Sequence, residues 1–244
     1  MFTPARTLTP PSALADMALD EAIDIWLIDL DAAPPHFGDL LNEEERTRAG
    51  RFVSPIHSRR FATARGCLRT LLGNYLGCAP EVIAFDYGIW GKPSLRIPSG
   101  GRLAFNLAHS GAQALIAIGR TEALGVDIEI MRPMADWLDI AAKTFAPAET
   151  KALLSLPAHE QMEGFFACWT RKEAVVKFWG EGLSADMTSF EVSLDTRSSA
   201  HLITVGRNRG RDDIRLYAFK TAMNTWAALA APAGAGSPRF WLLR

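Results

Sequence analysis

The sequence predicts an α+β fold of two similar halves, each a long helix packed on a small antiparallel sheet. Each half of the chain holds one long segment with apolar residues at helical spacing. Several short segments rich in β-branched and aromatic residues follow it, separated by Gly, Pro and Ser turns. The 244 residues are 48% hydrophobic, which is enough to build a buried core in both halves. We expect the halves to span residues 1–123 and 124–244.

The first predicted strand covers residues 23–30, because apolar and acidic residues alternate there. The segment before it is expected to be a loose lead-in, since Pro10 and Pro11 break it. A long helix is predicted to start after Ser54, an N-cap residue followed by Pro55 in the first turn, and to stop near Gly77. Short strands are then expected at 82–87, 103–107, 114–118 and 126–130.

The second half is predicted to repeat the order of helix and then strands. Apolar residues recur at helical spacing over 134–144 and 148–156, and most strongly over 162–179. Short strands are expected after them at 190–194, 214–219, 226–230 and 240–243. This repetition indicates two α+β units that face one another.

Charge and cysteine content exclude several classes of protein. Lys and Arg total 26 and Asp and Glu total 27, so the net charge of -1 argues against a nucleic-acid-binding surface. The longest uncharged stretch is cut by Gly and Pro and cannot supply the roughly 20 apolar residues that a membrane-spanning helix needs. The three cysteines are odd in number and lack metal-ligand spacing, which favours a reducing cytoplasm over a disulfide scaffold.

Two carboxylates are predicted to project side by side from the strand at 126–130. Val126 and Ile128 occupy one face of this strand, whereas Asp127 and Glu129 occupy the other. One interpretation is a half-buried strand whose acidic face meets water. The other is a cation site, because Mg²⁺ is usually bound by few carboxylates together with waters and substrate phosphates.

A third carboxylate falls inside the helix predicted at 162–179. Phe165, Trp169 and Glu173 recur at helical spacing, so Glu173 lies on or beside the apolar, inward-facing stripe. Lys172 and Lys177, two of only six lysines in the chain, bracket this glutamate. Glu173 and Lys177 could form a surface ion pair. Alternatively, a carboxylate with two cations is a reasonable site for a metal-bound phosphate.

Basic residues of the first half are candidates for binding phosphate. Gly91 and Pro93 hold the backbone around Lys92, which is otherwise explained as part of an ordinary turn. His109, followed by Ser110, falls where a strand gives way to a turn, as a structural hydrogen-bonding group or as a donor to a phosphate. Guanidinium groups grip phosphate as a bidentate fork. One or two arginines of the 46–69 segment could therefore bind a terminal phosphate.

Taken together, these groups ask for a substrate with several phosphates. Carboxylates close to a polyphosphate would repel it by roughly 4 kcal/mol per close charge pair at an effective dielectric near 20. A divalent metal ion would therefore have to lie between the carboxylates and the phosphates.

Four motifs in register resemble the signature of the Sfp-type 4′-phosphopantetheinyl transferases. They are GKP at 91–93, FNLAHSG at 105–111, GVDIE at 125–129 and WTRKEAVVK at 169–177, with GEGLS at 180–184 close behind. The resemblance extends from about residue 46 to 194. The chain length is similar to that of the long, monomeric class of the family. Ala108 stands where many members have Ser before the His, which is expected to remove one hydrogen bond to the nucleotide.

The resemblance implies two halves related by a pseudo-twofold axis, with coenzyme A as substrate in the cleft between them. The implied cofactor is Mg²⁺, or Mn²⁺ in its place. Acidic residues would hold the metal, two lysines would contact the coenzyme A diphosphate, and four basic residues would bind the adenosine 3′-phosphate. In that order, these are Asp127, Glu129 and Glu173; Lys172 and Lys177; and Arg48, Arg60, Lys92 and His109.

The implied activity is that of a holo-[carrier-protein] synthase. A serine of an apo acyl or peptidyl carrier protein would attack the β-phosphorus of coenzyme A, releasing adenosine 3′,5′-bisphosphate. We expect Lys172 and Mg²⁺ to stabilise the developing charge, and Glu173, or a metal-bound water that it orients, to take the serine proton. Two alternatives remain open: a metal-dependent nuclease, although no lysine lies two residues beyond Glu129, and a non-catalytic module that binds coenzyme A or the carrier.

Overall fold

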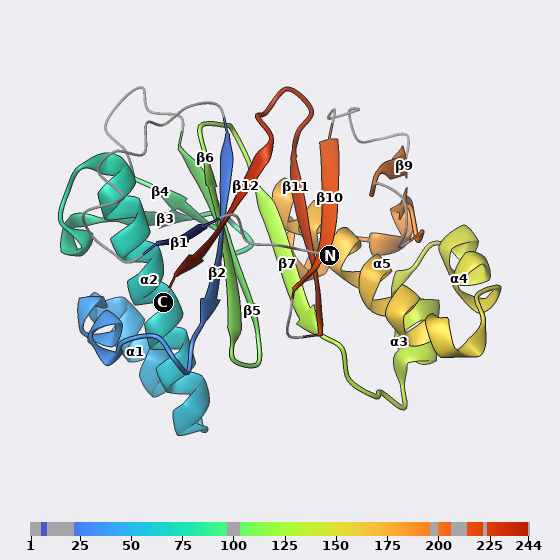
Figure 1. Ribbon diagram of the computed structural model, residues 1–244, viewed down its shortest axis with the longest axis horizontal. Helices are drawn as coiled ribbons and strands as arrows, with labels where there is room; N and C mark the ends of the chain where they lie inside the picture. The colour runs from blue at the N-terminus through green and yellow to red at the C-terminus, as the bar shows by residue number, and fades with distance from the viewer. Residues whose placement is uncertain are drawn as a thin grey trace.

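The computed structural model describes residues 6–8, 22–96, 103–195, 200–205, 214–221 and 224–243. It confirms the predicted α+β class, with helices and strands in both halves (Figure 1). Most of the expected lead-in lies outside the described residues. The expectation of a loose segment is wrong for β1 (Arg6–Leu8), which pairs with the C-terminal strand β12 (Pro238–Leu243).

In the first half, the structure matches the predicted strand at 23–30 and the predicted long helix. Helix α1 and strand β4 were not predicted. Helix α1 is short and mostly charged, so it has no apolar stripe to detect. The elements of the first half are, in order, β2 (Ile23–Asp29), a 3-10 helix (Pro35–Leu40), α1 (Glu43–Gly50), α2 (Pro55–Leu76), a 3-10 helix (Pro80–Val82), β3 (Phe85–Tyr87), β4 (Pro93–Leu95), β5 (Ala104–Ser110) and β6 (Gln113–Gly119).

In the second half, all the predicted helices and strands occur, and the helix predicted at 162–179 begins four residues earlier. The elements are β7 (Gly125–Ile130), α3 (Trp137–Thr144), α4 (Pro147–Leu154), α5 (Ala158–Trp179), two 3-10 helices (Gly182–Ser184 and Met187–Ser189), β8 (Phe190–Val192), β9 (Leu202–Val205), β10 (Ile214–Thr221), β11 (Thr225–Pro232) and β12.

Two main sheets stand next to each other in the middle of the molecule. The first has the strand order β1-β12-β2-β6-β5 and the second has the order β10-β11-β7. Helix α2 lies beside the first sheet and α5 beside the second, at opposite sides of the molecule (Figure 1). A shared apolar core, to which Ile25, Leu115, Val126 and Leu229 contribute, joins the sheets. The halves therefore pack as one unit.

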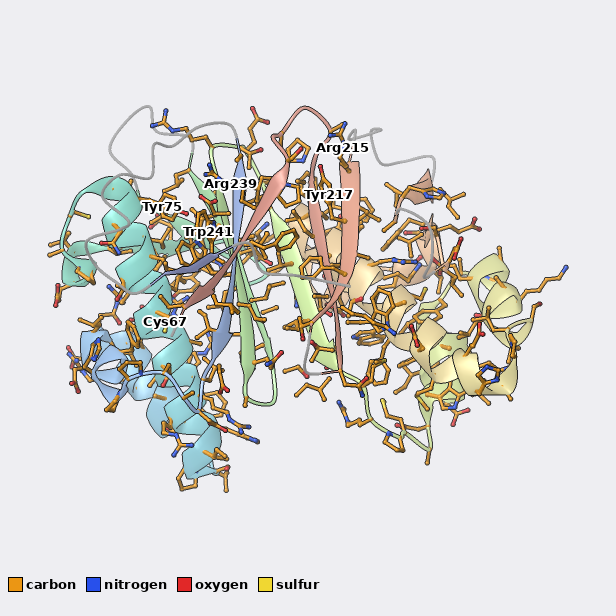
Figure 2. The ribbon with its side chains drawn as sticks, in the orientation of Figure 1. Cys67, Tyr75, Arg215, Tyr217, Arg239 and Trp241 are labelled. Atoms are coloured by element: carbon orange, nitrogen blue, oxygen red, sulfur yellow. The ribbon has the colours of Figure 1, made fainter. Side chains whose placement is uncertain are left out.

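Strand β12 departs from the predicted division at residue 123. It lies in the first sheet and pairs parallel with both β1 and β2, so this sheet is mixed rather than antiparallel. The side chain of Trp241 stacks on the fully buried Trp26, with ring centroids 5.6 Å apart. Figure 2 shows Trp241 and Arg239 of β12 on the side of the sheet that holds Tyr75 of α2. The end of the chain thus completes the core of the first half.

The two halves share one local construction. Helices α2 and α5 each have 22 residues and end at a glycine in the left-handed region, Gly77 or Gly180. An eight-residue helix precedes each of them, and its third residue is a buried glutamate, Glu45 in α1 and Glu149 in α4. Each glutamate accepts a hydrogen bond from the backbone N–H of the residue that caps the start of its helix, Glu45 from Asn42 at 3.0 Å and Glu149 from Ala146 at 2.7 Å.

Each of these glutamates also pairs with the fifteenth residue of the long helix. Glu45 accepts from Arg69 of α2 at 2.7 Å, and Glu149 accepts from Lys172 of α5 at 2.6 Å. Both basic side chains are fully buried. The same internal ion pair therefore ties the short helix to the long helix in both halves.

Candidate functional site

Strand β7 and helix α5 approach each other unusually closely at Gly125. A Cβ atom at this position would lie 2.0 Å from the carbonyl oxygen of Ala174. Only glycine allows this contact. The close approach turns the face of α5 that carries Glu173 and Lys177 toward the acids of β7.

Asp127 is the most buried of the three predicted acids. Its side chain is 6% exposed, so the interpretation of a strand face that meets water is wrong at this residue. Lys177 Nζ donates to Asp127 Oδ1 at 2.5 Å, whereas the buried Oδ2 atom has no hydrogen-bond partner in the described structure. Burial raises the pKa of Asp127, and Lys177 opposes the rise. An unpaired buried carboxylate oxygen is costly and calls for a ligand.

Glu129 and Glu173 share the charge environment of Asp127. Burial raises the pKa of Glu173, and the charges of Asp127 and Glu129 add to the rise while Lys177 opposes it. Burial also raises the pKa of Glu129, and Asp127 adds to it. Lys177 faces all three acids, and although its burial opposes a positive charge, they raise its pKa. Glu173 of α5 thus lies within electrostatic reach of the two acids of β7, which are distant from it in the sequence.

These residues fit a divalent cation in their chemistry. They offer hard carboxylate oxygens, one of which is buried and unpartnered. Within the described ranges, no three His, Cys, Asp or Glu side chains already form a metal-ligand set. The ammonium of Lys177 instead neutralises the carboxylate of Asp127. Mg²⁺ generally takes one or two carboxylates, with phosphates and waters completing its shell. A site that a phosphate substrate completes need not be closed by protein groups alone.

Strand β5 of the first half runs alongside β7 and contacts it through side chains. Asn106 Oδ1 accepts from Val126 N at 2.8 Å, and Ser110 Oγ accepts from Ile130 N at 3.2 Å. Sequence reasoning missed Asn106 and gave Ser110 no role. The signal was present, since both residues belong to the FNLAHSG motif.

His109 lies within a group of basic residues from both halves. Its strand ends at Ser110 and a turn follows, so His109 lies near the end of a strand, as predicted. Crowding by protein atoms lowers the pKa of His109, and the charges of Lys177, His57, Arg48 and Arg60 lower it further. Four elements thus direct positive charge to one place, which suits an anion. The basic residues around His109 come from α1, α2 and α5.

The two arginines of this group already have contacts within the protein. Arg60 pairs with Asp31 through Nε at 3.0 Å and Nη2 at 2.5 Å, and this pairing holds the pKa of Asp31 at about 2. Arg48 lies over the ring of Phe61, 5.2 Å from its centroid. Arg60 would have to share its guanidinium with Asp31 to bind a phosphate.

The structure gives Lys92 a different role from the expected contact with a phosphate. Its ammonium donates to the backbone oxygens of Leu124, Lys177 and Phe178, at 2.9, 2.5 and 3.2 Å. These three bonds use all its donors. Burial lowers the pKa of Lys92 to about 8. Lys92 therefore joins the first half to the C-terminal end of α5.

The expected catalytic role of Lys172 needs correction. Its side chain is fully buried, and its ammonium donates to Glu149 Oε2 at 2.6 Å and to the backbone oxygen of Phe190 at 2.7 Å. It neighbours Glu173 in sequence, but successive residues of a helix point about 100° apart. The helix therefore directs Lys172 into the core of the second half and Glu173 toward β7.

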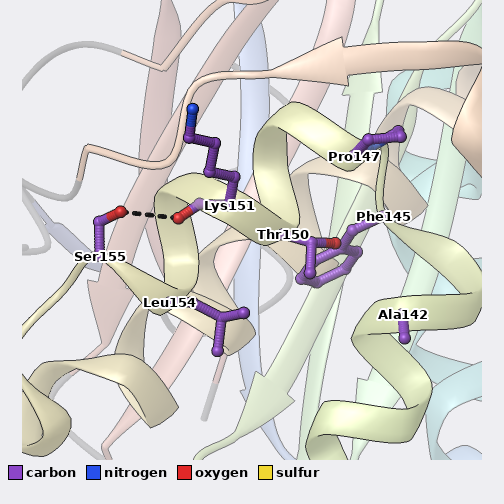
Figure 3. A pocket seen from close by; sticks show the side chains of 7 residues that line it. All are labelled: Ala142, Phe145, Pro147, Thr150, Lys151, Leu154 and Ser155. Atoms are coloured by element: carbon purple, nitrogen blue, oxygen red, sulfur yellow. Dashed lines mark hydrogen bonds between the residues drawn. The ribbon is translucent and has the colours of Figure 1, made fainter.

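A separate pocket of about 610 Å³ opens on the surface of helices α3 and α4 (Figure 3). Phe145 and Leu154 give it an apolar lining, and Ser155 donates to the backbone oxygen of Lys151 at 2.8 Å. None of the predicted site residues lines it.

No helix in the described ranges is both long and apolar enough to span a bilayer.

Comparison with known proteins gives a consistent family. Residues 123–228 match the family model of the 4′-phosphopantetheinyl transferase superfamily. The 4′-phosphopantetheinyl transferase HetI of Nostoc sp. is 37% identical over 228 residues, which cover 91% of this chain and 93% of HetI. The 4′-phosphopantetheinyl transferase Sfp of Bacillus subtilis is 34% identical over 168 residues, covering 63% of this chain and 72% of Sfp.

A solved structure of the Thermotoga maritima holo-[acyl-carrier-protein] synthase is 17% identical, with a TM-score of 0.37 over 45% of this chain and 62% of that one. The likeness to HetI, in contrast, extends over nearly the full length of both proteins. The four motifs that resemble the Sfp-type signature lie inside the matched length. The chain therefore belongs to the Sfp-type 4′-phosphopantetheinyl transferase family.

Proposed function

We propose that this chain transfers the 4′-phosphopantetheine group of coenzyme A to a serine of an apo carrier protein at the junction of β5, β7 and α5. Family membership supports the reaction and leaves the nuclease alternative without support. The observation that supports this location is the buried Oδ2 atom of Asp127, which has no hydrogen-bond partner among the described residues although Lys177 engages the other oxygen. A cation brought by a diphosphate would supply the missing partner.

Asp127, Glu129 and Glu173 would hold Mg²⁺, or Mn²⁺ in its place. The ion would neutralise the diphosphate oxygens and the charge that develops on them. Lys177, which faces the three acids, would move its ammonium toward the diphosphate when the cation arrives. His109 and the arginines around it would bind the terminal phosphate of the nucleotide, since their charges act on one place.

Glu173 is the proposed base for the carrier serine. Burial and the neighbouring acids raise its pKa, which brings it closer to the working pH of a general base. Lys172 is left out of the mechanism because its ammonium is buried against Glu149. The Glu173→Gln variant is expected to lose about 1000-fold in kcat, as the loss of a general base does. A wild-type kcat for this variant at saturating Mg²⁺ would refute the role.

The test of the overall proposal is a mass measurement. The protein is mixed with coenzyme A, Mg²⁺ and an apo carrier protein, and the carrier is weighed by mass spectrometry. We expect the carrier to gain one phosphopantetheine group, and the gain to vanish when the acceptor serine is replaced by alanine. Binding of coenzyme A and carrier without any mass gain would instead identify a non-catalytic module.

The proposed setting is a monomer in the cytoplasm. The cysteines Cys67, Cys78 and Cys168 are free, which suits a reducing compartment. Both halves contribute residues to the site from one chain, so no second copy is needed to complete it. Sedimentation of the purified protein at one chain mass would agree with this.

A further inference from the structure

Ser110 is a polar residue of the acid site to which the proposed mechanism gives no role. It is the last residue of β5, is buried, and belongs to the first half of the chain. Its hydroxyl donates to Glu129 Oε2 at 2.7 Å and accepts from Ile130 N at 3.2 Å. A hydroxyl has a single proton to donate, so these two bonds leave it one orientation.

The turn that follows Ser110 is packed tightly onto the end of β7. Gly111 has a φ of 55°, and a Cβ atom there would lie 2.6 Å from Ile130 Cδ1. Gln113, which is opposite Ser110 in the β5–β6 ladder, is buried and accepts hydrogen bonds from Thr221 and Thr225 of the second half. Ser110 is therefore held in place relative to β7 from both sides of the turn.

Asn106 makes a comparable contact four residues earlier. Its side chain accepts from Val126 N, just as Ser110 accepts from Ile130 N, so two side chains couple β5 to β7 at an equal spacing along both strands. The bond from Ser110 to Glu129 has no counterpart at Asn106. The role of Ser110 therefore exceeds that of joining the strands.

We propose that Ser110 is a positioning residue for the metal site. It holds Glu129 Oε2, and within the described chain no hydrogen bond or ion pair engages Glu129 Oε1, which is left for the cation. Without this bond, the side chain of Glu129, which is 27% exposed, would be free to turn outward to Arg132, whose Nη1 atom lies 4.0 Å from Oε2. This inference rests on the proposed function, because it requires a cation at the acids.

The test measures binding of Mn²⁺ to the full chain in the presence of coenzyme A and without carrier, by electron paramagnetic resonance of the free ion. The Ser110→Ala variant is expected to bind Mn²⁺ about 10-fold more weakly, as for other residues that orient a metal ligand. Ser110→Thr, which keeps the hydroxyl, is expected to restore most of the affinity. Ser193→Ala is the matched control, since Ser193 is a buried serine far from the acids in sequence, and within the described residues its hydroxyl contacts the backbone N–H of His201 alone.

The outcomes separate this inference from the proposed function. Wild-type Mn²⁺ affinity in Ser110→Ala, with binding lost in Asp127→Asn, would overturn the role of Ser110 and leave the metal site standing. Unchanged binding in Asp127→Asn would overturn both. If Ser110→Ala fails to fold, Ser110→Cys replaces it, because a thiol is similar in shape and a weak donor. A wild-type Mn²⁺ affinity in Ser110→Cys would contradict the proposal. So would a Mn²⁺ affinity in Ser110→Thr as low as that in Ser110→Ala.

Discussion

Strand β2 of the first half begins with the residues IDIW, and β7 of the second half contains VDIE. In each, the aspartate is buried and accepts a hydrogen bond from the last turn of a 22-residue helix, Asp24 from Tyr75 and Asp127 from Lys177. Both oxygens of Asp24 have partners, since Arg239 and the indole of Trp241 also donate to it. Asp127 keeps one buried oxygen to which no group in the described part of the chain donates.

The difference continues along the strands. The position two residues after the aspartate is Trp26 in β2, fully buried, and Glu129 in β7, partly exposed. One copy of the framework is therefore filled with apolar and paired groups that stabilise it. In the other copy, a carboxylate with one unpartnered oxygen among the described residues and a second, partly exposed carboxylate occupy the same positions. Groups that reduce stability in a repeated framework are retained at sites that bind a ligand.

The largest expected effect separates the two aspartates by activity. Asp127→Asn should lower kcat/KM by about 1000-fold, since it removes the buried oxygen charge that a divalent ion needs. Its melting temperature should stay near that of the wild type, because asparagine keeps an acceptor for Lys177. Transfer kinetics and calorimetry check both. Loss of stability in proportion to activity would favour a structural role for Asp127.

The second effect tests the ion pairs that the halves share. Lys172→Met should destabilise the protein by about 3–5 kcal/mol, because it leaves the buried Glu149 without its cation. Arg69→Met should destabilise it by less, because Arg65 still pairs with Glu45 at 2.9 Å. The activity of the folded Lys172→Met protein should stay within a few-fold of the wild type. Urea unfolding and kinetics at saturating substrate measure these. A large loss of kcat in folded Lys172→Met would return Lys172 to the mechanism.

Asp24→Asn provides the converse of the Asp127 experiment. We expect a loss of about 2 kcal/mol in unfolding free energy, because the charge-assisted bonds from Arg239 and Trp241 weaken. The folded enzyme should keep its kcat and its apparent affinity for Mg²⁺. Chemical unfolding and a parallel Mg²⁺ titration measure the two quantities. An unchanged stability, or a weakened affinity for Mg²⁺, would contradict the prediction.

The smallest effect concerns Lys92, which links the halves. Its pKa of about 8 in the folded protein lies below the ordinary lysine pKa of 10.5, so the unfolded chain binds the proton more tightly. The contribution of Lys92 to stability should therefore rise with pH between about 8 and 10.5. The difference in unfolding free energy between wild type and Lys92→Met, measured across this range, isolates the group. A difference that does not vary with pH would mean that the Lys92 ammonium is not buried.

The sequence predicted most elements, and the failures have physical causes. Helix α1 has no apolar stripe, so periodicity could not reveal it, although Asn42 and Glu45 form a capping box that could have done so. The parallel pairing of β12 with β2 depends on contacts between residues more than 200 positions apart. No local pattern encodes such pairing.

The candidate site was predicted in part. The alternation in β7 and the stripe of α5 pointed to Asp127, Glu129 and Glu173; the charges of the two β7 acids act on Glu173 in the structure, and the role of all three as metal ligands stays a prediction. The predicted roles of Lys172 and Lys92 differ from their contacts in the structure, because the direction and the acceptors of a side chain depend on tertiary contacts. Lys172 pairs with Glu149, and Lys92 donates to the end of α5. A basic residue near a motif can bind a phosphate or satisfy a buried acceptor, and one sequence does not distinguish these.

The most direct test of the account is a crystal structure with Mn²⁺ and coenzyme A, in which anomalous scattering locates the ion. The account predicts a peak bonded to Asp127 Oδ2 and to oxygens of Glu129, Glu173 and the diphosphate, with Lys177 turned from Asp127 to the phosphates. A peak elsewhere, or a bound coenzyme A with Asp127 still paired only to Lys177, would contradict it.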